Sequence, residues 1–249
     1  MKIFYSGVCD KGAKRKINQD SIWMSSNQDN TMNLFVVADG MGGHFKGEYA
    51  SQAIVEGLGK WAEAFYPEDY DKKFKKMMIS LQNKILEVNK QIYQNYNQSQ
   101  VCGCTCVVLF RYEDTYGIIS VGDSRIYKKR GWKVQLLTKD DVWENQAKIR
   151  DRFSLKEIKE HPNFGKLLCA VGTSEDISLS VQTDILKKGD SFLLCSDGLY
   201  KYCDEKRFVK ILKRTNVDNI NISVKKLLKA VYDEGAGDNI SIILIRCDL

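Results

Sequence analysis

The order of strand-like and helix-like segments constrains the fold of this chain more than any other feature of its sequence. Runs rich in Val, Ile and Leu, typical of strands, lie at 2–9, 21–26, 33–38, 102–138 (several strands), 178–186, 190–195 and 240–247. Apolar residues at helical spacing lie at 50–61, 70–97, 204–214 and 219–233. Because the helices come in pairs and do not alternate singly with strands, we predict an α+β fold: two packed antiparallel β-sheets flanked by pairs of helices, an α-β-β-α sandwich.

Four aspartates stand where apolar strands end in tight turns. They are Asp39, Asp123, Asp197 and Asp238, in the segments VVADGMGGH, SVGDSR, LLCSDG and AGDNIS. A carboxylate at such a point is held on rigid scaffold at the edge of the core, and four of them can converge. Converging carboxylates repel each other unless a cation lies among them. All-oxygen ligands without His or Cys suit Mg²⁺ or Mn²⁺. The pattern therefore predicts a two-metal hydrolase, and its details favour a phosphatase.

Each of these motifs also has an ordinary structural interpretation. The Asp-Gly pairs at 39–40 and 197–198 are typical of hairpin turns, as is Asp123 between two strands, and Asp238 can cap its loop as an Asx turn. Taken together, these interpretations are less convincing than each is alone, because all four carboxylates would have to stand at strand ends by accident. Gly40 lacks a Cβ, so its carbonyl group can approach a metal closely.

Composition excludes several other classes of protein. The 249 residues carry a net charge of +6 with no basic stripe interleaved with aromatic residues, so we expect no nucleic-acid partner. The chain shows neither a signal peptide nor a run of about 18 apolar residues, so we expect no membrane partner. Of the eight cysteines, Cys102, Cys104 and Cys106 alternate as on one face of a strand and lack zinc-site spacing. Buried free thiols indicate a reducing compartment, and we expect a cytoplasmic monomer of one domain.

The motifs together resemble a known family. RKINQD, VVADGMGGH, GCTC, SVGDSRIY, LTKDD, HPNFGKLLCAVG, DSFLLCSDGLY and GAGDNIS occur in the order typical of the PPM family of metal-dependent protein serine/threonine phosphatases. The chain is similar to the short bacterial single-domain form, and the resemblance spans nearly all of 1–249. It implies a β-sandwich flanked by helix pairs, which agrees with the pattern of elements.

The resemblance implies a role in metal binding for five residues. Asp39 would bridge two Mn²⁺ or Mg²⁺ ions, and the carbonyl group of Gly40 would bind the first of them. Asp197 and Asp238 would complete the second. Asp123, together with Asp197, would hold a third, weaker ion.

The resemblance also implies how the reaction proceeds. Water activated by the two metal ions would attack the phosphorus of phosphoserine or phosphothreonine directly, in opposition to a Ser/Thr kinase. Arg15, whose planar fork matches phosphate oxygens, would hold the phosphate, although an arginine between two lysines is more often surface charge. Asp20 would act mainly through metal-bound water, and Asn239 would orient the site.

Three departures from the family pattern leave questions open. Asp141-Val142-Trp143 (141–143) stands where the family has His-Ser and leads into a polar segment at about 141–166, which we interpret as a flap that selects substrates. Cys104 replaces a threonine, for which we expect only a packing change. Met41 stands where some relatives have His, and His44 is interpreted as a structural residue rather than a general acid. The alternatives are a catalytically weak member acting as a regulatory binding module, and a metal-dependent nuclease or small-molecule phosphatase.

Overall fold

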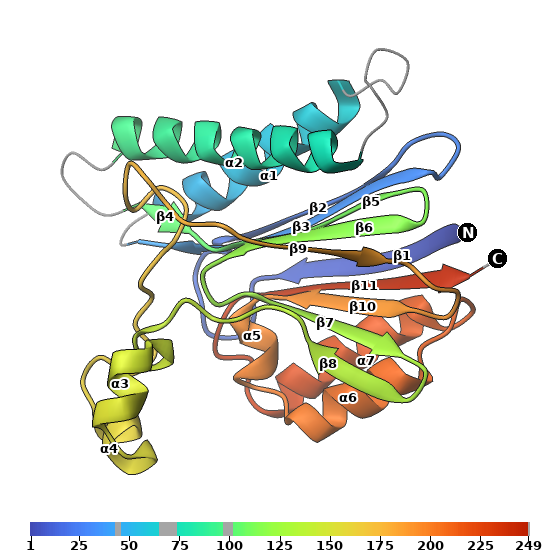
Figure 1. Cartoon of the computed structure of the whole chain (residues 1–249). Coiled ribbons are helices and arrows are strands. Elements are labelled where there is room, and N and C mark those ends of the chain that lie inside the picture. Colours follow the sequence, from blue (N-terminus) through green and yellow to red (C-terminus); the bar gives the residue numbers. More distant parts are fainter. Residues whose placement is uncertain (43–45, 65–73, 97–101, 249) are drawn as a thin grey trace.

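Two antiparallel sheets lie face to face in the computed structural model, which describes residues 1–42, 46–64, 74–96 and 102–248 (Figure 1). The first sheet has five strands in the order β1-β11-β10-β7-β8. Their bounds are β1 Lys2–Asp10, β11 Ile240–Asp248, β10 Ser191–Cys195, β7 Arg125–Arg130 and β8 Lys133–Leu136. The first and last strands of the chain thus pair with each other, and both termini lie at the same end of this sheet.

The second sheet has six strands, five of them in the order β2-β3-β5-β6-β9, with β4 paired to the end of β3. Their bounds are β2 Asp20–Ser26, β3 Met32–Met41, β4 Gly103–Cys104, β5 Cys106–Tyr112, β6 Thr115–Val121 and β9 Ser180–Ile185. Within 102–138, β5 pairs with β6 and β7 pairs with β8 through short hairpin connections, whereas the chain passes from one sheet to the other between β6 and β7.

Helices cover the outer face of each sheet (Figure 1). Over the six-stranded sheet lie α1 Lys46–Ala64 and α2 Phe74–Tyr96, and over the five-stranded sheet lie α5 Asp197–Tyr200, α6 Glu205–Arg214 and α7 Ile220–Asp233. Three short helices stand apart from both layers: η1 Trp143–Asn145, α3 Ala147–Arg152 and α4 Leu155–Glu160. No helix in the described ranges combines the length and the apolar character needed to cross a membrane.

Coverage on both faces explains why the central strands are continuous apolar runs. Along β3, Leu34 and Val36 pack under the helices, whereas Phe35 and Val37 pack between the sheets. Successive side chains of a strand point to opposite faces, so both faces must be apolar when both are covered. Equivalent alternation in β10 places Leu193 under the second helix layer. The burial of these faces is the main force that holds the two sheets and their helices together.

The predicted fold class is confirmed, and the predicted segments correspond to observed elements with small shifts at their ends. The second predicted helix, 70–97, is seen as Phe74–Tyr96, and its remaining residues lie outside the described ranges. The short helix α5 was not predicted, because its first residues were interpreted as a turn. Six of the eight cysteines are buried, including the three of the CGCTC segment, and none forms a disulfide.

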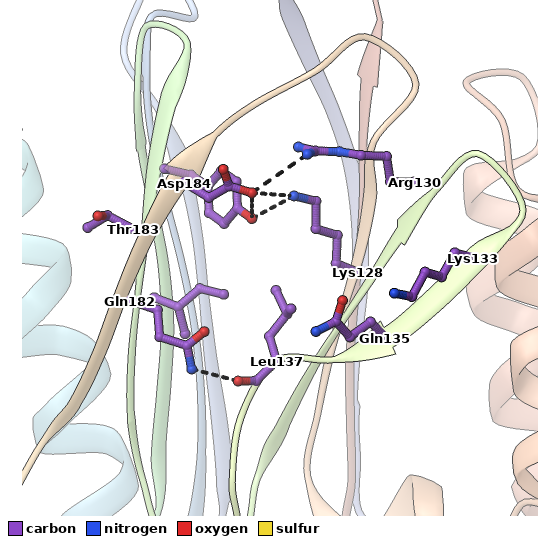
Figure 2. A pocket seen from close by; sticks show the side chains of 10 residues that line it. Lys128, Arg130, Lys133, Gln135, Leu137, Gln182, Thr183 and Asp184 are labelled. Carbon is purple, nitrogen blue, oxygen red and sulfur yellow. Dashed lines mark hydrogen bonds and ion pairs between the residues drawn. The ribbon is translucent and has the colours of Figure 1, made fainter.

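Polar side chains close the open edge of the sandwich, where β9 faces the β7–β8 hairpin (Figure 2). Lys128 Nζ donates hydrogen bonds to the Tyr116 hydroxyl at 2.8 Å and to Asp184 at 2.9 Å. Arg130 donates to both carboxylate oxygens of the fully buried Asp190, at 2.8 and 2.7 Å. All of these residues except Asp190 line a cavity of about 430 Å³ in which the buried charges are paired, and none of its lining residues also lines the pocket of the carboxylates predicted to be functional.

Candidate active site

The predicted carboxylates come together at one end of the sandwich. Asp39 lies near the end of β3, Asp123 in the turn after β6, Asp197 directly after β10, and Asp238 just before β11. These strand ends belong to both sheets, and all four carboxylates line one pocket of about 310 Å³. The sandwich topology therefore brings into one place residues that are up to about 200 positions apart in the chain.

Two glycines allow the strand ends to approach this closely. A Cβ placed on Gly40 would collide with the carbonyl oxygens of Gly47 and Gln19, and the Gly40 amide donates to the Gln19 carbonyl at 3.0 Å. A Cβ on Gly198 would collide with the Asn239 carbonyl. The glycine of each Asp-Gly pair is thus required where another backbone segment passes the site.

Asp20 lies beneath the pocket, at the start of β2 and directly opposite Asp39 in the strand register. It is 6% exposed, its Oδ2 accepts a hydrogen bond from the Ser196 hydroxyl at 2.7 Å, and its Oδ1 has no hydrogen-bond partner. Burial raises the pKa of Asp20 to about 7, and repulsion from nearby carboxylates acts in the same direction against the Ser196 hydrogen bond. A buried carboxylate with an orphaned oxygen is a position where a cation would be favourable.

Repulsion between carboxylates also raises the pKa of two residues on the pocket wall. Burial raises the pKa of Asp39 well above its usual range, with further contributions from Asp20, Asp197 and Asp123. Burial and then Asp197 raise the pKa of Asp123 to about 6. A positive charge among these groups would relieve the repulsion and restore their ionised forms.

Two basic side chains neutralise carboxylates at the rim. Arg15 pairs with Asp238 at 2.7 Å, while Lys201 pairs with Asp197 at 2.5 Å and faces Asp123 at 3.9 Å. Burial lowers the pKa of Lys201, but the two carboxylates outweigh it and raise the pKa overall. Over the described part of the chain, no three Asp, Glu, His or Cys side chains form a preformed metal ligand set. Asp238 and Asp197 are thus each paired with a basic side chain of the protein itself.

Asn239 occupies the pocket wall but is engaged by the neighbouring loop. Its Oδ1 accepts from the Gln19 amide, and its Nδ2 donates to the carbonyls of Lys11 and Ile17, all at 2.9 Å. The side chain thus fastens the β1–β2 loop, which carries Arg15, to the start of β11. This geometry supports the predicted orienting role and leaves no free donor on the amide for a substrate.

Thr105 is a site residue that the sequence analysis missed. Its Oγ1 accepts from the Asp39 amide at 3.0 Å and shares a hydrogen bond of 2.7 Å with the Ser124 hydroxyl, next to Asp123. Its amide donates to the Asp39 carbonyl at 2.8 Å. Thr105 therefore fixes the backbone of two neighbouring strand ends. The only signal in the sequence is its place in the GCTC motif, where the alternating cysteines dominate the pattern.

Tyr200 supports Asp123 from behind and was also missed. Its hydroxyl donates to the Asp123 carbonyl and carboxylate at 3.0 and 3.2 Å. The guanidinium of Arg125 lies 3.6 Å from the centre of the Tyr200 ring and pairs with Asp140 at 2.7 Å. Asp123 and Arg125 lie in the motif SVGDSRIY, and Tyr200 lies in LLCSDGLY. Nothing in either local pattern indicates that Tyr200 contacts the other two residues.

The segment that departs from the family pattern joins the pocket to the short helices. The Asp141 carboxylate accepts from the Gly122 amide at 3.0 Å, which braces the turn before Asp123. Trp143 stacks on His161 at 4.1 Å between ring centres. Gly165 and Leu167, beyond these helices, line the pocket itself together with Met41. His44, interpreted from sequence as a structural residue, lies outside the described residues.

Comparisons with known proteins agree with this geometry. The protein phosphatase 2C family model matches residues 12–229. The serine/threonine phosphatase stp of Listeria monocytogenes serotype 4b is 30% identical over 246 residues, 96% of this chain and 94% of that protein. The solved serine/threonine phosphatase Stp1 from Staphylococcus aureus has a TM-score of 0.86 at 26% identity, covering 100% of this chain and 96% of that one. The PstP catalytic domain in complex with two manganese ions shares the fold, with a TM-score of 0.80 at 23% identity over 98% of this chain and 97% of that one. The chain therefore belongs to the protein phosphatase 2C family of metal-dependent protein serine/threonine phosphatases.

Proposed function

We propose that this chain dephosphorylates phosphoserine and phosphothreonine at the pocket where the four strand-end aspartates meet, and that it opposes a Ser/Thr kinase in the cytoplasm. The observation that carries the proposal is the convergence of Asp39, Asp123, Asp197 and Asp238 on one pocket with Arg15 at its rim. Phosphoproteins are the substrates that follow from the family. Cytoplasmic location is supported by eight free cysteines, which are typical of reducing compartments.

The residues of the pocket fit the divalent ions that the family requires. The acidic donors offer oxygen only, the preferred ligand of Mn²⁺ and Mg²⁺. Asp39, the carbonyl group of Gly40, Asp197 and Asp238 would hold two ions, and Asp123 with Asp197 a third, weaker one. When bound, such ions lower the pKa of water and offset negative charge on the phosphoryl group. The raised pKa values of Asp20 and Asp39 support this assignment, because a positive charge nearby would favour the ionised carboxylates.

The side chains of the chain itself supply orientation. Arg15 is half exposed at the rim, and its guanidinium can leave Asp238 to form charge-assisted hydrogen bonds with phosphoryl oxygens. Asp20 is anchored by the Ser196 hydroxyl, so its free oxygen keeps a fixed direction beneath the pocket. Asn239 holds the Arg15 loop at the correct distance from the carboxylates. Each role is positional or electrostatic, and none requires a covalent protein nucleophile.

A hydrolysis assay with three substrates tests the proposal. The purified protein is given p-nitrophenyl phosphate, a phosphothreonine peptide and single-stranded DNA, with Mn²⁺, with Mg²⁺ and with EDTA. We expect metal-dependent release of phosphate from the first two and none in EDTA. Cleavage of the DNA would favour a nuclease, and hydrolysis of p-nitrophenyl phosphate alone a small-molecule phosphatase. Mn²⁺ binding without turnover of any substrate would favour a regulatory binding module.

A further inference from the structure

Lys201 is a basic residue inside the carboxylate pocket to which neither the motifs nor the proposed reaction assign a role. It ends the short helix α5, one turn after Asp197, and its amide donates to the Asp197 carbonyl at 2.9 Å. Residues four apart on a helical turn lie on the same face. The turn that begins at the Asp-Gly pair therefore delivers the Lys201 side chain back to the Asp197 carboxylate.

A single ammonium group faces two carboxylates that are assigned to metal ions. Lys201 Nζ lies 2.5 Å from Asp197 Oδ2 and 3.9 Å from Asp123 Oδ2. These carboxylates are mostly buried, with side chains 14% and 9% exposed, whereas the lysine side chain is 50% exposed. The lysine thus reaches in from solvent and can withdraw, while the carboxylates cannot move away from each other. The Tyr200 hydroxyl further restricts Asp123 by donating a hydrogen bond to its carboxylate.

We propose that Lys201 is a built-in counter-cation for the Asp123–Asp197 pair and competes with divalent ions for it. The inference rests on the proposed function, since the competition matters only if these carboxylates bind metal. The ammonium group relieves their repulsion in the metal-free protein, and a divalent ion must displace it before both carboxylates can become ligands. The first ion, which Asp39 and the carbonyl group of Gly40 would hold, does not meet this competitor.

Removal of this competitor should change metal affinity in the opposite sense to ordinary damage to an active site, which weakens metal binding. Removing the positive charge of Lys201 should make Mn²⁺ bind more tightly, because the metal no longer has to break an ion pair. For a half-exposed pair we expect the weakest Mn²⁺ site to tighten by about threefold to tenfold. The metal-free protein should become less stable, since the two carboxylates then repel each other without a partner.

Titration calorimetry with Mn²⁺ on the full chain tests this inference. The variants are Lys201→Met, which keeps the apolar stem, and Lys201→Arg, which keeps the charge. Lys229→Met is the matched control, because Lys229 forms a comparable four-residue pair with Asp233 at 2.6 Å on α7, away from the pocket. We expect tighter Mn²⁺ binding, or an additional bound ion, in Lys201→Met alone. Melting of each metal-free variant checks its fold and should show the lowest midpoint for Lys201→Met.

The outcomes separate this inference from the function on which it rests. If wild type binds Mn²⁺ and hydrolyses the phosphopeptide while Lys201→Met gives the same isotherm or a weaker one, the inference is overturned and the function stands. If neither protein binds Mn²⁺, the proposed function fails and the inference fails with it. If Lys201→Arg tightens Mn²⁺ binding as much as Lys201→Met, the charge is not the cause, and the inference is again overturned.

Discussion

The carboxylates of the pocket differ in the charged groups that surround them. Asp238 and Asp197 have basic partners in Arg15 and Lys201 at the rim. Asp39 faces other carboxylates, and its pKa is raised well above the usual range by burial and by their charge. At the residue scale, the consequences of a substitution therefore differ between positions that look equivalent in sequence.

Asp39→Asn removes a charge from the most repulsive position. We expect turnover of a phosphothreonine peptide to fall by about 100-fold or more, because Asp39 is the carboxylate that would hold the divalent ions at the centre of the pocket. The metal-free protein should melt at the same temperature or a few degrees higher, since repulsion is relieved. Asp197→Asn should lose activity similarly but gain less stability, because Lys201 loses its partner. Asp29→Asn, an exposed residue between β2 and β3, is the control. Near-normal turnover in Asp39→Asn would contradict the assignment.

Arg15→Ala should weaken phosphate binding and leave the metal sites intact. A hydrogen bond to a charged group contributes about 1.5–3 kcal/mol, so kcat/KM should fall by about 10- to 100-fold, with a higher KM. Mn²⁺ affinity should be unchanged or slightly higher, since Asp238 loses a competing partner. Steady-state kinetics and Mn²⁺ titration measure the two effects, and Lys14→Ala is the control in the same loop. Loss of a tight Mn²⁺ site with normal KM would show that the role is wrong.

At the element scale, the strands position the carboxylates, and the short helices of 141–166 adjoin the pocket. The helices stand apart from both layers (Figure 1), yet their segment returns to the pocket through Gly165 and Leu167. Its internal contacts include the stacked Trp143 and His161. An element fixed at the pocket edge but not covered by the core is well placed to contact the protein part of a substrate. We propose that this flap selects substrates.

Replacing Lys148, Arg150 and Arg152 with Ala tests the flap. All three are exposed on or beside α3. We expect turnover of p-nitrophenyl phosphate to change by less than about twofold, because the metal pocket is untouched. The preference for phosphopeptides with acidic flanks should decrease by severalfold, since surface charge pairs contribute up to about 1 kcal/mol each.

Three exposed lysines on the helices over the five-stranded sheet provide the matched control for the flap variant. Replacing Lys210, Lys225 and Lys226 on α6 and α7 removes the same charge elsewhere. This control should keep the wild-type peptide preference. Unchanged preference in the flap variant, measured with peptides that differ only in their flanks, would refute the flap role and leave the metal assignment intact.

At the scale of the whole molecule, the sandwich gathers strand ends from both sheets at the end opposite the termini (Figure 1). A concentrated negative charge is therefore built into the fold, and the free energy of unfolding should depend on pH when no metal is bound. The pKa of Asp20 is raised to about 7 and that of Asp123 to about 6, from an ordinary value of 3.8. A carboxyl whose pKa is raised by folding contributes stability at low pH, and this contribution is lost as pH rises through the folded pKa.

The metal-free protein should accordingly melt at a lower temperature at pH 8 than at pH 5. The decline should be concentrated between pH 5 and about 7, and saturating Mn²⁺ should remove most of it because the ion neutralises the carboxylates. Asp39→Asn should show a shallower decline than wild type. Thermal melting at several pH values in EDTA and in Mn²⁺ measures this. A metal-free midpoint that rises steadily from pH 5 to pH 8 would contradict the account.

Much of this protein follows from local patterns in its sequence. Strand and helix periodicity predicted the two sheets and the helix pairs, because burial on a known face imposes a repeat of two or of about 3.6 residues. The four aspartates at strand ends could be recognised because apolar runs stop beside them. The family motifs then placed Arg15, Asp20 and Asn239 near the same pocket. All these signals are contained within short stretches of chain.

The contacts that tune the pocket were decided only by the tertiary structure. Thr105 meets Asp39 across 66 positions, and Tyr200 meets Asp123 across 77. Neither pairing leaves a local repeat in the sequence, because it depends on which strand ends the sandwich places side by side. Lys201 lies within one helical turn of Asp197, but it faces a pair of carboxylates only because the fold brings Asp123 close from the end of another strand. Local periodicity determines elements, whereas the electrostatic balance of a site is set by long-range packing.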